Sequence, residues 1–146
     1  MTYDVGQKYT VVIPDVITLT NQSGAYGDGG FAVTINAASD ALKLPNAKKL
    51  TVAIKTGTFL ELGTTGDVAD GSDTGTGLNY TVNKGTAYSA DSGDQVTPSS
   101  GAFVEAVTGE TTNQTQNLFI KTGAPKLAGT YEGTLTFTVD PAVNIS

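Results

Sequence analysis

The stretch "LAGTYEGTLTFTVDP", residues 127–141, alternates apolar with hydroxyl side chains over most of its length. It places Tyr131, Leu135, Phe137 and Val139 on one side of an extended chain, and threonines with a glutamate on the other. Successive side chains of a strand point to opposite faces, so this pattern predicts a strand with one buried face. We expect that face to pack between two sheets.

Glycine and proline interrupt the same stretch. Gly133 takes an inward position without a side chain, which predicts a bulge or the close approach of another backbone. Gly129 is expected to open the strand and Pro141 to end it, because proline cannot donate a hydrogen bond to a ladder. The outward threonines form a neutral face, and its desolvation against a neighbour costs less than that of lysine or glutamate.

Similar alternation recurs along the chain and predicts further strands. Turn-rich segments separate the runs, a short pairing is expected around Val96, and only residues 40–49 suggest a helical turn. The pattern therefore predicts an all-β domain of two antiparallel sheets with seven or eight strands. The other runs are "KYTVVIPDVITLT" (8–20), "GGFAVTIN" (29–36), "KLTVAI" (49–54), "LNYTV" (78–82), "AFVEAV" (102–107) and "TQNLFIKT" (115–122).

The first of these runs contains a proline at its centre. Pro14 divides residues 8–20 into two apolar halves. This position predicts an edge strand, or a strand that breaks and changes its partner midway. One half is then available to pair with a strand of another subunit.

Composition limits the classes of partner. The 146 residues fit a single domain, taken as residues 1–146, and the net charge is −6. The basic residues are scattered lysines without any arginine, so neither nucleic acid nor an anionic membrane is an expected partner. The N-terminus "MTYDVGQKY" lacks the basic and apolar regions of a signal peptide.

The residue types argue against catalysis. Without histidine or cysteine, the chain has no Ser-His-Asp triad, no thiol nucleophile and no ordinary zinc, copper or haem site. A pair of carboxylates can hydrolyse glycosides, and the candidates are Glu61, Glu105, Glu110 and Glu132 with ten aspartates. Solvated surface acids are the more ordinary interpretation. We therefore expect a protein that is not an enzyme and has no catalytic residues.

One loop offers a candidate metal site. The segment "DVADGSD" carries Asp67, Asp70 and Asp73 around Gly71, and oxygen ligands on a flexible loop suit calcium. The spacing of three departs from the EF-hand pattern, and aspartate with glycine also serves ordinary turns. Calcium is the one cofactor that we consider, and otherwise we expect none. Further loop aspartates that could join the site are Asp28, Asp91 and Asp94.

Three tyrosines stand in terminal or loop segments. Tyr3, Tyr26 and Tyr88 provide rigid amphipathic rings that can contact a partner or a glycan. Covering the ends of a sandwich is the alternative role for such rings.

The first and last strands together resemble a known group of modules. The opening "YTVVIPDVITLT" and the closing "AGTYEGTLTFTV" are similar to Ig-like β-sandwich modules of Gram-positive bacterial surface proteins. That group includes WxL-type envelope domains and filament subunits, and similar modules decorate the virions of phages that infect those bacteria. The chain has no tryptophan, so the motif that names the WxL domains is missing. The resemblance implies an Ig-like fold and a non-catalytic role.

We therefore expect a structural protein displayed on a larger assembly. The first hypothesis is a phage capsid decoration or other virion accessory protein, located on the virion. The second is an extracellular surface or pilin-like filament subunit of a Gram-positive bacterium, expressed without its signal peptide. The third is a small carbohydrate-binding module. The expected partners are other protein subunits, in a homo-oligomer or in a capsid or surface assembly, with a glycan as a further candidate.

Overall fold

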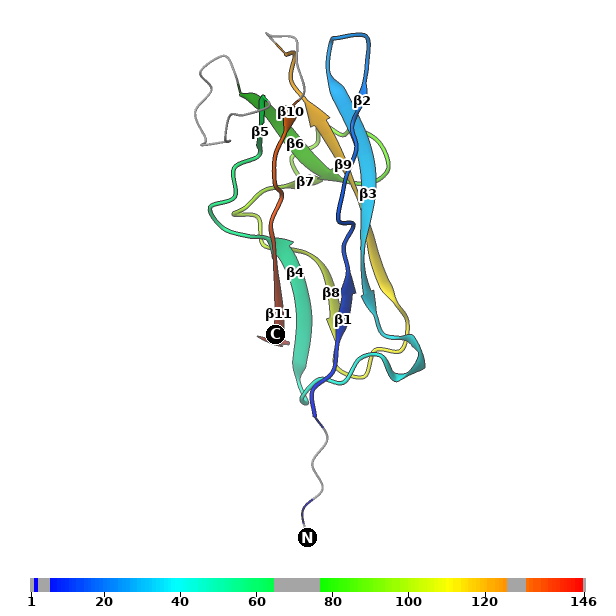
Figure 1. Cartoon of the computed structure of the whole chain (residues 1–146). Coiled ribbons are helices and arrows are strands. Elements are labelled where there is room, and N and C mark those ends of the chain that lie inside the picture. Colours follow the sequence, from blue (N-terminus) through cyan, green and yellow to red (C-terminus); the bar gives the residue numbers. More distant parts are fainter. Residues whose placement is uncertain (1, 3–5, 65–76, 126–130, 146) are drawn as a thin grey trace.

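The computed structural model describes residues 2, 6–64, 77–125 and 131–145, and these form two antiparallel sheets (Figure 1). The all-β sandwich predicted from the alternation is confirmed. The described part contains eleven strands rather than seven or eight, because each predicted terminal strand is divided in two and residues 61–64 form a further short strand. The strands are β1 (Thr10–Val12), β2 (Thr20–Asn21), β3 (Gly27–Asn36), β4 (Lys48–Ile54), β5 (Glu61–Thr64), β6 (Leu78–Lys84), β7 (Gln95–Val96), β8 (Ala102–Val107), β9 (Gln114–Thr122), β10 (Tyr131–Glu132) and β11 (Phe137–Asn144).

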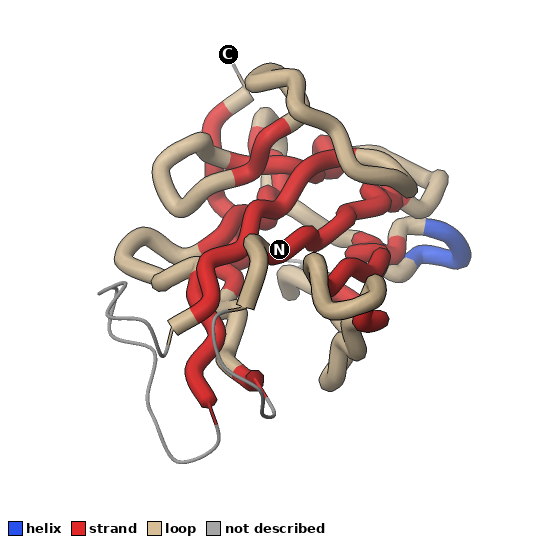
Figure 2. Tube along the Cα trace, turned by 90° about the horizontal axis from the view of Figure 1, so that it is seen from above, coloured by secondary structure: helices blue, strands red, loops and turns tan. Residues whose placement is uncertain are grey.

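The larger sheet has the order β1-β3-β9-β6-β5-β10, with β2 also paired to β3 and β7 to β6. The smaller sheet has the order β11-β4-β8. The longest ladder joins β3 to β9, from Asp28 opposite Lys121 to Ile35 opposite Gln114. Figure 2 shows the strands forming the body, with the single described 3₁₀ turn, Ala38–Asp40, at its periphery. That turn starts two residues before the segment predicted for it.

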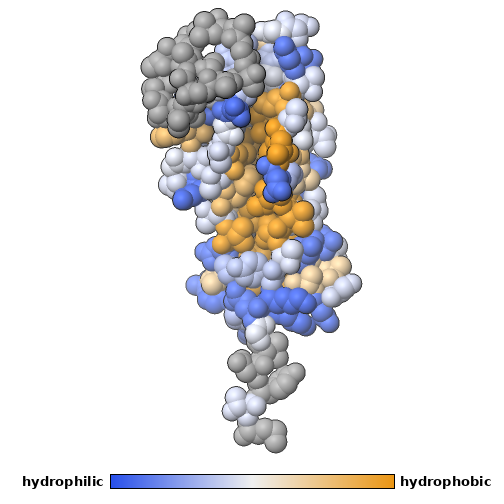
Figure 3. All heavy atoms as spheres, viewed as in Figure 1, coloured by the Kyte–Doolittle hydropathy of each residue, from blue (hydrophilic) through white to orange (hydrophobic). Residues whose placement is uncertain are grey.

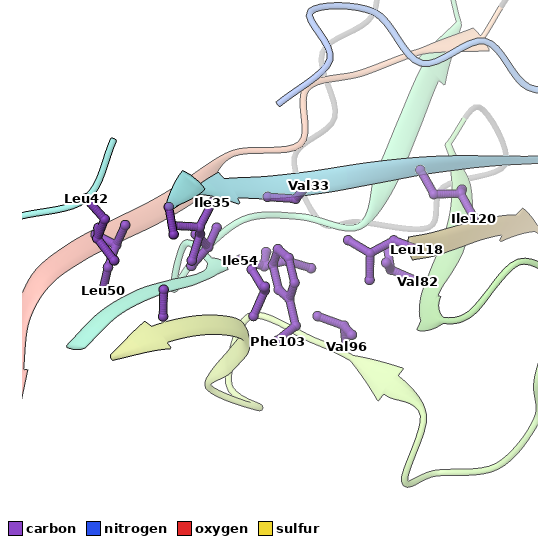
Figure 4. Packing of buried hydrophobic residues seen from close by; sticks show 14 of the residues in the cluster. Val33, Ile35, Leu42, Leu50, Ile54, Val82, Val96, Phe103, Leu118 and Ile120 are labelled. Atoms are coloured by element: carbon purple, nitrogen blue, oxygen red, sulfur yellow. The ribbon is translucent and has the colours of Figure 1, made fainter. Parts of the chain in front are cut away.

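The core lies between the two sheets and uses the inward positions of the central strands (Figure 4). Side chains of this size contribute about 1.5–3 kcal/mol each when fully buried. The alternation predicted these positions correctly, because a strand that is buried on one face must carry its apolar residues two apart. The completely or almost completely buried ones include Val33, Ile35, Leu50, Val52, Ile54, Val82, Val96, Leu118 and Ile120.

The first strand is divided and lies at the edge of the larger sheet. Both halves, β1 and β2, pair with β3, so the chain breaks at Pro14 without changing its partner. Gly29 lets the second half approach, since a Cβ there would stand 2.9 Å from the carbonyl oxygen of Thr18. The edge position was predicted correctly, and the alternative of a second partner was wrong.

The closing stretch is two strands rather than one. β10 pairs with β5 in the larger sheet, whereas β11 pairs with β4 in the smaller sheet. Gly133 stands between them, and a Cβ there would lie 2.9 Å from the carbonyl oxygen of Glu61, which confirms the predicted close approach. Pro141 does not end the strand: β11 continues to Asn144 with a register shift after Asp140, because an edge strand tolerates proline. Gly129 lies outside the described residues.

The inward side chains of this closing stretch are half-buried rather than fully buried. β11 is an edge strand, so a neighbouring strand covers it on one side only. Phe137 nevertheless ties it to both sheets. Its ring meets Phe31 of β3 at 6.2 Å and Phe103 of β8 at 5.8 Å between centroids, both edge to face.

Candidate interaction surfaces

The four glutamates have separate environments. Glu105 forms an ion pair with Lys49 at 3.0 Å, and Glu110 accepts hydrogen bonds from the backbone N–H groups of two following threonines. Glu132 is exposed on β10. Glu61 is buried, with 5% of its surface exposed, and lies against Gly77. The interpretation as solvated acids is therefore wrong for Glu61, and its place in the apolar run "FLEL" was the available signal.

The predicted calcium ligands Asp67, Asp70 and Asp73 lie outside the described residues. Within the part of the chain that is described, no three metal-ligating side chains come together.

The loop aspartates considered as additional ligands fix local turns. Asp28 accepts a hydrogen bond from the Gln22 amide at 3.0 Å, and Asp94 accepts one from the Ser89 hydroxyl at 2.7 Å. Asp91 accepts one from the backbone N–H of Gly93 at 2.9 Å. Each carboxylate therefore has a turn-stabilising role of the kind common for aspartate.

Two of the three singled-out tyrosines meet around a lysine on the outer face of the larger sheet. The Lys121 Nζ atom lies 4.5 Å from the centre of the Tyr26 ring and 4.2 Å from the centre of the Tyr88 ring. Both distances are well inside the range of cation–π attraction, about 6 Å. Tyr3, the third, lies outside the described residues. We call Tyr26, Lys121 and Tyr88 the tyrosine clamp.

Three elements that are distant in sequence position the clamp. Tyr26 ends the turn between β2 and β3, where its carbonyl accepts a hydrogen bond from the N–H of Gln22 at 2.8 Å. Lys121 projects from β9, opposite Asp28 of β3. Tyr88 belongs to the loop between β6 and β7. The sequence suggested the two rings separately, and their meeting depends on a ladder register that no local pattern shows.

A buried asparagine holds the loop that carries Tyr88. Asn83 is fully buried, and its amide donates to the carbonyls of Lys84 at 3.0 Å and Ala87 at 2.9 Å. Its side-chain oxygen accepts from the N–H of Ser89 at 3.2 Å. These bonds fix the backbone on both sides of Tyr88 and so determine where its ring is presented. Sequence reasoning did not identify Asn83.

A second surface lies along the divided edge of the larger sheet. Residues 13–19 join β1 to β2, and within the described part of the chain they make no backbone–backbone hydrogen bond. Val12 and Val16 are 51% and 79% exposed on this edge. Figure 3 shows hydrophobic residues gathered in a strip along the face between β1 and β11. The two segments that border this strip carry half-buried apolar side chains, namely Val11, Ile13, Ile17, Leu19, Leu135, Phe137 and Val139.

Comparisons with known proteins give no family for this chain. No family model matches it, and no curated protein matches it. One similar solved chain belongs to a structure of the chaperone–tip adhesin complex in CFA/I fimbriae biogenesis, with 18% identity and a TM-score of 0.48. The alignment covers 92% of the present chain and 42% of that one, so this chain spans less than half of its length. No helix among the described residues is long and apolar enough to cross a membrane.

Proposed function

We propose that this protein is a non-catalytic structural subunit that joins a larger assembly through the divided edge of its larger sheet. The observation that carries the proposal is the backbone of residues 13–19, which makes no backbone hydrogen bond to any described residue and lies beside a strip of half-buried apolar side chains. Free N–H and C=O groups at a sheet edge form a template for a strand from another chain.

The side chains at this edge support the same role. Natural proteins usually protect an exposed edge with charged side chains, proline or a covering loop. Here Val12 and Val16 face solvent. Residues 11–17 are valine or isoleucine except for Pro14 and Asp15. A partner strand with apolar residues two apart would bury the strip and pair with the free backbone groups.

The proposal has two forms, which differ in the assembly. In the first, the protein decorates a phage capsid or is another virion accessory protein. In the second, it is a surface or pilin-like filament subunit of a Gram-positive bacterium, outside the cell. The resemblance of the terminal strands to Ig-like modules of both kinds supports both forms. Immunogold labelling separates them, since the first expects gold on virions and the second expects gold on cells or filaments.

Sedimentation velocity over a concentration series, with purified virions or cell-envelope filaments as added partners, tests the assembly role. The unchanged protein is expected to self-associate or to sediment with one of these particles. Val16→Lys places a charge at a largely exposed position and should weaken association at least about tenfold, which corresponds to 1.4 kcal/mol. Ser99→Lys, in an exposed turn away from this edge, is the control and should associate normally. A protein that stays monomeric at every concentration and sediments with no particle contradicts the proposal.

A further inference from the structure

We infer that the tyrosine clamp binds a saccharide that carries a carboxylate, with Lys121 holding the acid group and Tyr88 contacting the sugar ring. The inference goes beyond the assembly role and concerns a different surface. It rests on the Lys121 ammonium group, which has no ion pair among the described residues, on the exposed ring beside it and on two small residues of β3 on the same face.

The Lys121 ammonium group has no acidic partner within ion-pair distance among the described residues. It forms no ion pair with any residue in the described part of the chain, where the two ion pairs involve Lys43 and Lys49. Asp28 stands directly opposite on β3, and its carboxylate, which accepts a hydrogen bond from Gln22, lies beyond ion-pair distance of the Lys121 Nζ atom. The two tyrosine rings attract the ammonium group without accepting its protons in conventional hydrogen bonds. Its N–H donors therefore remain available to an anion.

The tyrosines supply both kinds of contact that a sugar needs. Tyr88 is 47% exposed, and neither its hydroxyl nor that of Tyr26 makes a hydrogen bond among the residues that the structure describes. A tyrosine ring offers an apolar face, and its hydroxyl both donates and accepts hydrogen bonds. A sugar ring likewise combines C–H groups with hydroxyls, so the two surfaces are complementary.

The position of the clamp favours a saccharide over a peptide. Lys121 lies on β9, which is paired with β3 on one side and with β6 on the other. The backbone groups at this point are therefore used within the sheet, and a peptide cannot add a strand here as it can at an edge. Recognition is left to the lysine, the two rings and their hydroxyls.

Two small residues of β3 lie beside the clamp. Gly30 and Ala32 follow Asp28 on the same outward face of β3, opposite Phe119 and Asn117 of β9. A Cβ at Gly30 would meet its nearest atoms at 3.6 and 3.7 Å, which are ordinary contacts. The backbone of β3 therefore admits a Cβ at Gly30, and the branches of a valine there would stand beside the Phe119 ring on the outward face.

Titration followed by backbone amide NMR tests the site, with 3′-sialyllactose and trigalacturonic acid as acidic probes and lactose as the neutral probe. The acidic probes are expected to bind about tenfold more tightly than lactose, as one charge-assisted hydrogen bond allows. Shifts should centre on Tyr26, Tyr88 and Lys121. The two acidic probes show whether the site accepts a sialic acid, a uronic acid or both, and each of these results supports the inference.

Three variants and one control locate the binding. Lys121→Met should remove the preference for acidic probes, and Tyr88→Ala should weaken binding of both acidic probes and lactose. Gly30→Val should block binding while the melting temperature is kept, which separates loss of the site from loss of the fold. Lys55→Met removes an exposed lysine on the segment after β4 and should change nothing. The inference is overturned by equal affinity for lactose and the acidic probes, by binding that survives Lys121→Met and Gly30→Val, or by a polyglutamate peptide that binds as tightly.

Discussion

Individual glycines decide where the two terminal segments can lie against the sheets. At Gly29 a Cβ would press on the backbone of Thr18, and at Gly133 it would press on the backbone of Glu61. At Gly30, the next residue on β3, the same atom would meet only ordinary contacts. Two adjacent glycines therefore have different roles, one allowing close packing and the other leaving a surface open.

Replacement of these adjacent glycines by alanine separates the two roles. Gly29→Ala should lower the free energy of unfolding by about 1–3 kcal/mol, because the second half of the first strand must move away. Gly30→Ala should leave it unchanged or raise it by about 0.4–1 kcal/mol through the lower entropy of the unfolded chain. Urea denaturation of both variants measures the difference. Equal effects of the two substitutions would contradict the close approach at Gly29.

Tyr80 makes the stability of the folded protein depend on pH in the alkaline range. Burial raises the pKa of Tyr80 from 10.0 to about 12 in the folded protein. The unfolded chain therefore loses this proton first, so the contribution of Tyr80 is complete below about pH 10 and is lost as the pH rises toward about 12. Tyr80→Phe has no such proton. The difference in unfolding free energy between the unchanged protein and Tyr80→Phe should be constant at neutral pH. Above pH 10 the unchanged protein should lose stability relative to Tyr80→Phe. A difference that stays constant up to pH 12 contradicts the assignment.

Among the elements, the central strands are the ones that alternation predicts well. In β3, β4 and β9, periodicity and burial agree at Val33, Ile35, Val52, Leu118 and Ile120. The reason is physical: these strands have neighbours on both sides and a core on one face, so each inward position is fully constrained.

The terminal strands show what alternation cannot predict. The pattern of residues 131–139 continues unchanged through residues 133–136, where the chain passes from one sheet to the other. A period of two specifies which face is buried, but not which strand lies alongside. The same limit explains the tyrosine clamp, since Tyr26 and Tyr88 were recognisable as loop rings whereas the position of Lys121 between them depends on the register of β9.

Phe137 couples β11 to the core, and a double-mutant cycle measures this coupling. Phe137→Leu and Phe103→Leu should together cost about 0.5–1.5 kcal/mol less than the sum of the single substitutions, since either one already removes the edge-to-face contact. A second cycle combines Phe137→Leu with Ser99→Ala as the control. The losses of unfolding free energy from these two substitutions should simply sum, because Ser99 lies in a separate exposed turn. Additivity of the two phenylalanine substitutions would mean that the contact between these two rings does not stabilise β11.

For the whole molecule, the two surfaces divide the proposed roles between them. The divided edge offers free backbone groups and apolar side chains to a strand of another subunit. The tyrosine clamp lies on the outer face of the larger sheet, where β9 is paired with both β3 and β6. It offers a ligand one ammonium group and two aromatic rings. A protein built in this way can be held in an assembly by its edge while its outer face stays open to a ligand.

Hydrogen exchange of the backbone amides of residues 13–19 tests the central claim most directly. These amides should exchange quickly in the dilute protein, because none of them donates a backbone hydrogen bond to a described residue. Pro14 is not observed, because proline has no amide proton. On self-association or binding to a particle they should become protected, while the amides of β8 (Ala102–Val107) keep their rates. Assembly that leaves the exchange of residues 13–19 unchanged would contradict the proposal that this edge joins the protein to its neighbours.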